Sequence, residues 1–226
     1  MYEFRKMSPA MREKVVAERK LLGHPWHAPP HFGTEPSVYL LSAACFDHRA
    51  ILSTVARRDE WLARLLTIRD ESDVDLRAWV VLPNHYHLLA RVALPSFEAW
   101  IHKRHNATAT KWNREDGTPG RKVWHRFTDR AIRTEAHYFA SLNYIHANPA
   151  KHGCVAKSQD WKWSSLHEYV ESLGSERLAD LWRTYPSDVK QAAAKAGITN
   201  LFYADAHTRS YFFGIFSQRT LIFYGD

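Results

Sequence analysis

Four short apolar runs in the middle of the chain have the length and composition of β-strands. The second and third runs are separated only by Pro83-Asn84, a dipeptide typical of a turn, so these two strands should form a hairpin. The four predicted strands cover residues 38–46, 75–82, 85–92 and about 129–133.

Apolar side chains at helical spacing predict three longer helices between and after these strands. The first should begin at Ser53 or Thr54, either of which can act as N-cap. The second should begin at Ser96, and the third should stop at Pro149, because proline disfavours a helical conformation of the preceding residue. The predicted helices cover residues 53–69, 96–113 and 134–147, and the apolar side of the first consists of Val55, Trp61, Leu62, Leu65 and Leu66.

The predicted order is β-α-β-β-α-β followed by a helix, which indicates an α+β fold. Two βαβ halves around an antiparallel hairpin predict a ferredoxin-like sheet with helices on one face, formed by residues 37–185. Residues 1–36 should form an extension, with a short helix over 8–22 that Ser8 caps and an arm rich in Pro, His and Gly. Residues 186–226 change in character and are predicted to form a tail of unknown role.

Composition narrows the class of protein. The chain has 226 residues, of which 45% are hydrophobic and 24% charged, and no apolar run reaches the roughly 18 residues that span a bilayer. The charged N-terminus has no apolar signal region, so we expect a cytoplasmic protein without a membrane partner. Cys45 and Cys154 lack a CxxC partner and are predicted to be reduced thiols rather than a disulfide or a zinc site.

The charge balance is basic, with 31 Lys and Arg against 24 Asp and Glu, for a net charge of +7. Nine tryptophans and ten tyrosines accompany this charge. Basic and aromatic side chains together suit a polyanion whose bases can stack, which is to say a nucleic acid. A basic protein with another partner would have the same composition, so charge alone leaves both interpretations open.

The segment 79-WVVLPNHYHLLARV-92 places His85 and His87 in an otherwise apolar strand. Side chains two positions apart on a strand point to the same face, so the two imidazoles project together while Tyr86 points to the opposite face. Two neutral imidazoles held side by side are a ready pair of metal ligands. Two histidines hydrogen-bonded beneath a helix would produce the same pattern, and the pair alone does not separate these interpretations.

A second segment, 141-SLNYIHANPAKHG-153, places Tyr144 and Asn148 one turn apart near the end of the third helix. Both residues should lie well away from the helix's apolar stripe, which consists of Tyr138, Leu142 and Ile145. A tyrosine that faces away from the core is available as a nucleophile once a base or a metal-held substrate activates it. An interface tyrosine beside a helix-capping asparagine remains the alternative.

Taken together, these segments resemble a known family. The segments 83-PNHYH-87, 144-YIHANP-149 and 160-DWKWSSLHEY-169 occur in the order found in the single-tyrosine HUH transposases, and the resemblance extends through 120-GRKVWHRFTDRAIR-133. The greatest likeness is to the REP-associated tyrosine transposases, which are related to insertion-sequence transposases and act on palindromic repeats. It covers residues 23–185 approximately.

The resemblance implies a metal-dependent transposase that nicks and rejoins single-stranded DNA at palindromic hairpins. His85 and His87 would bind a divalent metal, Mg²⁺ or Mn²⁺, with Asn148 completing the site, and Tyr144 would be the nucleophile. Cleavage would leave a 5′-phosphotyrosine link and a free 3′-hydroxyl that can rejoin strands. The partner would be single-stranded DNA with a hairpin, bound by a monomer or a homodimer in the cytoplasm and, with its DNA, at the nucleoid.

Further residues are candidates for DNA contact. In the family the arm before the first strand helps to recognise bases at the foot of the hairpin, which makes Trp26 and His27 candidates. The other candidates are basic residues of the second helix and of the segment before the third: Lys103, Arg104, Arg121, Lys122, Arg126, Arg130 and Arg133. Solvated basic side chains without a DNA partner are the alternative for these.

Two other functions remain open from the sequence. A domesticated protein could keep the fold and bind hairpins without catalysis, although the four intact site residues argue against this. A relaxase or replication initiator shares the HUH chemistry, but such proteins are usually larger. The chain departs from the family at Ala150, where valine is common, and in its tail.

Overall fold

The computed structural model describes residues 8–11, 13, 14, 17, 35–71 and 74–187. Contacts between Cα atoms divide the chain into residues 1–187 and 188–226, and the second of these units lies outside the described residues. So does most of the predicted arm, including Trp26 and His27. In the described part of the N-terminal helix, the backbone N–H of Met11 donates to Ser8 Oγ at 3.3 Å, as predicted for the N-cap.

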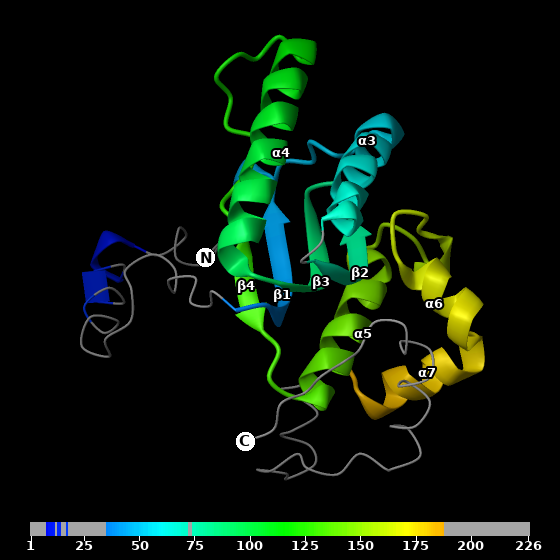
Figure 1. The fold of residues 1–226 in the computed structure, drawn as a ribbon. Helices are drawn as coiled ribbons and strands as arrows, with labels where there is room; N and C mark the ends of the chain where they lie inside the picture. Colours follow the sequence, from blue (N-terminus) through cyan, green and yellow to red (C-terminus); the bar gives the residue numbers. More distant parts are fainter. Residues whose placement is uncertain (1–7, 12, 15–16, 18–34, 72–73, 188–226) are drawn as a thin grey trace. The chain divides into compact units, whose positions relative to one another are not determined.

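Four antiparallel strands form one sheet in the order β2-β3-β1-β4 (Figure 1). This is the strand order of the ferredoxin-like fold, so the predicted α+β class and topology are confirmed. A turn at Pro83-Asn84 joins β2 to β3, as the sequence indicated. The strands are β1 (Ser37–Ala44), β2 (Asp75–Val81), β3 (His85–Val92) and β4 (Thr128–Ala131).

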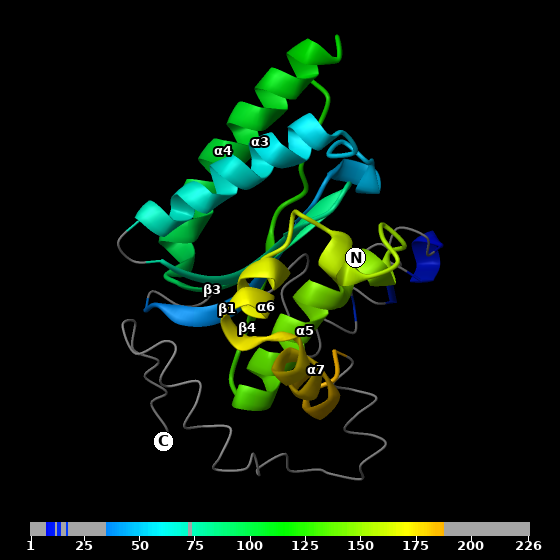
Figure 2. The same cartoon turned by 90° about the vertical axis from the view of Figure 1, so that its right-hand side faces the viewer.

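Each βαβ half contains one helix between its two strands. These helices are α3 (Val55–Leu66), between β1 and β2, and α4 (Leu94–Glu115), between β3 and β4. They pack on one face of the sheet (Figure 2), where the fully buried Trp61 of α3 contacts the ring of Tyr86 from β3 at 5.2 Å between centroids. Trp124, from the loop before β4, also packs on Trp61, with the ring centroids 4.7 Å apart. Aromatic packing therefore joins both helices and the sheet into the main core.

Two details of these helices differ from the prediction. Thr54 caps α3, since its side chain accepts the N–H of Arg57. Val55, which was predicted to lie on the apolar side, is 52% exposed. Ser96 does not cap α4; the helix begins earlier, after Ala93, with Pro95 in its first turn. Proline suits a first turn because its missing N–H has no partner there in any case.

Helix α5 (Glu135–Lys151) packs on the opposite face of the sheet, against β2 and β3 (Figure 2). Thr134 is its N-cap and accepts the N–H of His137 at 3.1 Å. The prediction that Pro149 stops this helix is wrong, because Pro149 lies inside it and the helix runs on for two residues.

The real end of α5 is a Schellman motif at Gly153, which has a φ of 67°. The N–H of Cys154 donates to the carbonyl of Pro149 at 2.9 Å, and that of Gly153 donates to Ala150 at 3.0 Å. These bonds satisfy the last carbonyl groups, so the one N–H that Pro149 lacks does not end the helix.

After α5 the chain forms two short helices, α6 (Leu166–Leu173) and α7 (Ser175–Thr184). Three single 3₁₀ turns complete the described elements: η1 (Phe46–His48), η2 (Thr67–Asp70) and η3 (Ser158–Asp160). In the part of the chain that the structure describes, none of the helices combines the length and the hydropathy that crossing a bilayer would need. Both cysteines are free thiols, as predicted, with Cys45 buried and Cys154 partly exposed.

Candidate active site between the sheet and helix α5

His85 and His87 lie side by side on β3, with their ring centroids 4.9 Å apart. Strand alternation directs both rings towards α5, while Tyr86 between them points to the other face and meets His105 Nε2 at 3.1 Å. Burial lowers the pKa of both histidines: that of His85 to about 4, with a further contribution from His152, and that of His87 well below its usual range. Both imidazoles are therefore neutral near pH 7, the form in which histidine binds a metal.

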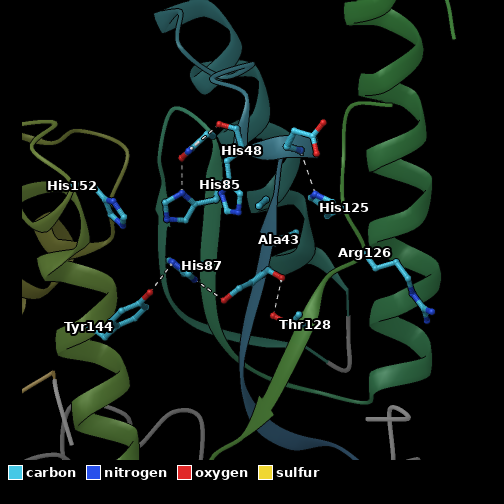
Figure 3. A pocket seen from close by; sticks show the side chains of 13 residues that line it. Ala43, His48, His85, His87, His125, Arg126, Thr128, Tyr144 and His152 are labelled. Carbon is cyan, nitrogen blue, oxygen red and sulfur yellow. Dashed lines mark hydrogen bonds between the residues drawn. The ribbon is translucent and has the colours of Figure 1, made fainter. Parts of the chain in front are cut away.

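Helix α5 brings Tyr144 and Asn148 to this histidine pair. Figure 3 shows Tyr144 beside His87. The hydroxyl of Tyr144 lies 3.4 Å from His87 Nε2, and the amide Oδ1 of Asn148 lies 3.4 Å from His85 Nε2. The four residues singled out in the sequence thus converge on one site. Asn148 was expected to lie away from the apolar stripe of the helix, yet it is fully buried, because the sheet covers one side of α5 and η3 and α7 pack on the helix as well.

Two polar residues that the sequence analysis did not identify hold the histidine rings from behind. Ser42 of β1 lies opposite His87 in the strand register, and its Oγ is 2.5 Å from His87 Nδ1. Asn84 Oδ1 is 2.6 Å from His85 Nδ1. Asn84 is next to His85 in the sequence and could have been suspected, whereas the contact with Ser42 follows from the pairing of distant strands.

The hydrogen bonds around His85 leave two acceptors facing each other. The amide nitrogen of Asn84 donates to the carbonyl of His48 at 3.2 Å, so its Oδ1 accepts the Nδ1–H of His85, and the Nε2 of His85 carries a lone pair. Asn148 uses its amide nitrogen to donate to the carbonyl of Tyr144 at 3.3 Å, which turns its oxygen towards that lone pair. Two hydrogen-bond acceptors 3.4 Å apart repel each other unless a cation lies between them. This pair of lone-pair atoms therefore suits a metal ion.

Among the described residues, no three His, Cys, Asp or Glu side chains are grouped to hold a metal ion. A metal at this site would therefore rest on two imidazoles and the amide oxygen of Asn148. Its other positions would be open to water or to substrate oxygens. Hard divalent ions such as Mg²⁺ and Mn²⁺ accept this mixture of nitrogen and oxygen ligands.

The site opens into a cavity of about 370 Å³ whose lining is rich in histidine (Figure 3). The ring of His152, at the end of α5, is 5.0 Å from that of His85, and the ammonium group of Lys151 lies 5.4 Å from the ring centroid of Tyr144. These two residues were part of the segment noted in the sequence, but no role was predicted for them. The lining residues are Ser42, Ala43, Ala44, Asp47, His48, Asn84, His85, His87, His125, Arg126, Thr128, Tyr144 and His152.

Some of the candidate DNA-contact residues already contact other side chains of the protein, and others are exposed. Arg121 is held by Asp116 at 2.7 Å, and Arg104 stacks on Trp100 at 3.8 Å and donates to Thr67 at 3.0 Å. Both arginines therefore hold α4 and the loop that follows it in place. The exposed candidates are Lys103, Lys122, Arg126, Arg130 and Arg133; of these Arg126 lines the cavity but points away from the histidine pair, 4.0 Å from Glu98.

Two curated proteins and one solved structure are similar to this chain. No protein-family model matches the chain. A REP-associated tyrosine transposase of Escherichia coli is 30% identical over 107 residues, or 47% of this chain and 62% of that protein. A putative REP-associated tyrosine transposase of Haemophilus influenzae is 30% identical over 105 residues, or 41% of this chain and 58% of that protein. The match thus spans about three fifths of each curated relative.

A solved structure of a REP-associated tyrosine transposase bound to a REP hairpin is similar in fold. The TM-score is 0.50 and the sequence identity 26%, over 62% of this chain and 83% of that chain. The sequence relatives and the structural neighbour therefore bear the same description, which is also the family that the sequence motifs resemble. In sequence and in fold, the chain is therefore similar to REP-associated tyrosine transposases.

Proposed function

We propose that the protein is a metal-dependent single-strand DNA transposase that nicks and rejoins DNA at palindromic hairpins. The observation that carries this proposal is the meeting of a tyrosine hydroxyl with one buried and one partly buried neutral imidazole and an amide oxygen at an open cavity. The description of the structural neighbour, which is bound to a REP hairpin, supports a hairpin as the substrate.

In the proposed reaction, Tyr144 Oη attacks the phosphorus of a phosphodiester. A bond forms between Oη and phosphorus as the bond from phosphorus to the 3′-oxygen breaks. Oη gives up its proton and the 3′-oxygen takes one up, which leaves a 5′-phosphotyrosine and a free 3′-hydroxyl. The phosphodiester bond is conserved on Tyr144, so a later 3′-hydroxyl can reverse the step and join strands without an external energy source. A hydrolase would lose that bond to water.

His85, His87 and Asn148 would hold the ion. A bound Mg²⁺ or Mn²⁺ would neutralise charge that develops on the phosphate oxygens during the attack. Because all three ligands are neutral, they would leave the charge of the ion undiminished towards the DNA. The lone pair on His87 Nε2 can accept the Tyr144 hydroxyl or bind a cation but not both, so the hydroxyl must find another partner when the ion is held.

Lys151 and Ser42 would support the same chemistry from outside the ligand set. The ammonium group of Lys151 lies near the ring of Tyr144 and would attract the phosphate towards the nucleophile. The hydroxyl of Ser42 would keep the His87 ring in the orientation that aims its Nε2 into the cavity.

A covalent-adduct assay tests the proposal. The protein is incubated with a single-stranded REP hairpin oligonucleotide and Mn²⁺ or Mg²⁺, and a protein–DNA adduct is sought on a denaturing gel. The wild-type protein should form the adduct and Tyr144→Phe should form none, because only Oη can make the new bond. Tyr39→Phe, which removes a hydroxyl on the other face of the sheet, serves as the matched control and should form the adduct.

The same assay separates catalysis from mere binding. If the wild-type protein binds its hairpin but forms no adduct with either ion, the protein is a hairpin-binding relative without transposase activity. If Tyr144→Phe still forms the adduct, another residue is the nucleophile.

A further inference from the structure

Beside the site, side chains on the same face of the sheet are partly exposed in the part of the chain that the structure describes. Helix α5 packs mainly against β2 and β3, at one side of the sheet. On β1 the side chains of this face stay partly exposed, whereas those of the opposite face are buried in the main core. The partly exposed residues of β1 are Val38, Leu40, Ser42 and Ala44.

Strand register connects this open surface to the candidate active site. His87 lies opposite Ser42, and Ser42 lies opposite Thr128 on the edge strand β4, so the three form a row across one face of the sheet. Thr128 and Ser42 also line the cavity that contains Tyr144. The cavity therefore extends from α5 across β1 to the β4 edge.

The next row of the sheet ends in a positive charge. Leu89 lies opposite Leu40, and Leu40 lies opposite Arg130 of β4. Arg130 is exposed. Arg133 is also exposed. Burial lowers the pKa of His137 most, and the positive charges of Arg130 and Arg133 lower it further. The two arginines therefore create a positive potential at this edge of the sheet.

We propose that the single strand next to the hairpin crosses the sheet over β1 and β4, with its backbone held by Arg130 at the β4 edge. This proposal rests on the proposed function, because it takes the DNA to enter at Tyr144. Two strand spacings separate β3 from β4, about 10 Å in all, which is roughly three stacked nucleotides. The sugars and bases would lie on Val38 and Leu40, and the phosphates beside Arg130.

Binding experiments with two probes test this path. The first probe is a blunt REP hairpin, and the second is the same hairpin with a short single-stranded extension at its foot, made once on the 5′ side and once on the 3′ side. We expect Arg130→Ala to weaken binding of one extended hairpin by about three- to tenfold and to lower its salt slope by about 0.7. Binding of the blunt hairpin should change less than about twofold, since that DNA does not reach β4.

Two further variants act as controls. Arg130→Lys keeps the charge and should restore most of the extension-dependent affinity, which a general loss of folding would not allow. Arg114→Ala removes an exposed arginine at the end of α4, on the opposite face of the sheet, and should bind all probes like the wild-type protein.

The outcomes distinguish this path from the proposed function. If Arg130→Ala weakens blunt and extended hairpins equally, or if Arg114→Ala has the same effect, the strand does not cross β4. Photocrosslinks from the extension to residues 37–44 or 128–133 would support the path, and crosslinks confined to α4 would overturn it. If the wild-type protein binds no hairpin of either kind, the proposed function itself fails.

Discussion

Asn148 is the residue whose role depends most on a single contact. Its Oδ1 faces the lone pair of His85 Nε2 at 3.4 Å, and its side chain is fully buried. Asn148→Leu keeps the branched shape of the side chain but removes the oxygen, so we expect the affinity for Mn²⁺ to fall about tenfold or more. Asn148→Asp keeps an oxygen ligand and should bind Mn²⁺ at least as well as the wild-type protein.

Isothermal titration with Mn²⁺ measures both variants, and circular dichroism checks that they remain folded. Unchanged affinity in Asn148→Leu would remove this residue from the metal site.

Ser42 provides a second prediction at the same scale. Its hydroxyl, 2.5 Å from His87 Nδ1, sets the orientation of a ring that would bind the ion through its other nitrogen. We expect Ser42→Ala to lower Mn²⁺ affinity by about ten- to a hundredfold, the usual cost of losing such a supporting contact. Ser42→Thr retains a hydroxyl on a strand position and should recover most of that loss; equal affinities for all three proteins would contradict the role.

The sequence could identify the residues that face the cavity but not those that support them. His85 and His87 could be paired from the two-residue period of a strand, and Tyr144 with Asn148 from the helical turn. Ser42 lies more than forty positions before His87, and its partner follows from which strands pair, a choice that periodicity along one strand does not contain.

At the scale of elements, the N-cap of α5 affects the helix that carries Tyr144. The Oγ1 of exposed Thr134 accepts the N–H of His137 at 3.1 Å, and without it that donor would lose its protein partner. We expect Thr134→Ala to reduce the free energy of unfolding by about 1 kcal/mol, and Thr134→Ser to reduce it by much less. Urea unfolding followed by circular dichroism measures the difference; an unchanged midpoint in Thr134→Ala would show that the cap contributes nothing.

Element boundaries were predicted well where a cap is local and poorly where proline was taken as a stop. Thr54 and Thr134 cap their helices through bonds to residues three positions on, which the sequence displays directly. Pro149 was misread as a stop, because proline near a helix end costs one bond that the Schellman motif at Gly153 outweighs. Ser96 was misread as the start of α4, which begins earlier because Pro95 is tolerated in a first turn.

At the scale of the whole molecule, the order of strands followed from the sequence but the position of α5 did not. The βαββαβ order leaves few topologies open, and the ferredoxin-like sheet is one of them. The burial of α5 on almost all sides hides the apolar stripe that would have indicated its partner. Its contact with the face opposite α3 and α4 creates the site, because it sets Tyr144 against the histidines.

The fold also buries several histidines in neutral form, on both faces of the sheet. Burial lowers the pKa of His85 to about 4 and those of His105 and His146 to about 3, and it lowers that of His87 well below its usual value of 6.5. Below pH 6.5 the unfolded chain takes up protons at these positions and the folded protein does not. The contribution of these neutral histidines to the free energy of unfolding is therefore fully present above pH 6.5, and it is lost as the pH falls from there towards their pKa values in the folded protein.

We therefore expect the free energy of unfolding, measured by urea titration without metal, to fall steeply between pH 6.5 and about 5. Four such histidines give a slope of at most about 5 kcal/mol per pH unit, which would exhaust a typical stability of about 5–15 kcal/mol within a few pH units. In His105→Gln the amide oxygen can still accept the hydroxyl of Tyr86. The variant should take up about one proton fewer on unfolding, so its free energy of unfolding should depend less steeply on pH. A flat profile over this range would mean that the folded protein takes up protons at these histidines as readily as the unfolded chain does, so that burial does not hold their rings neutral.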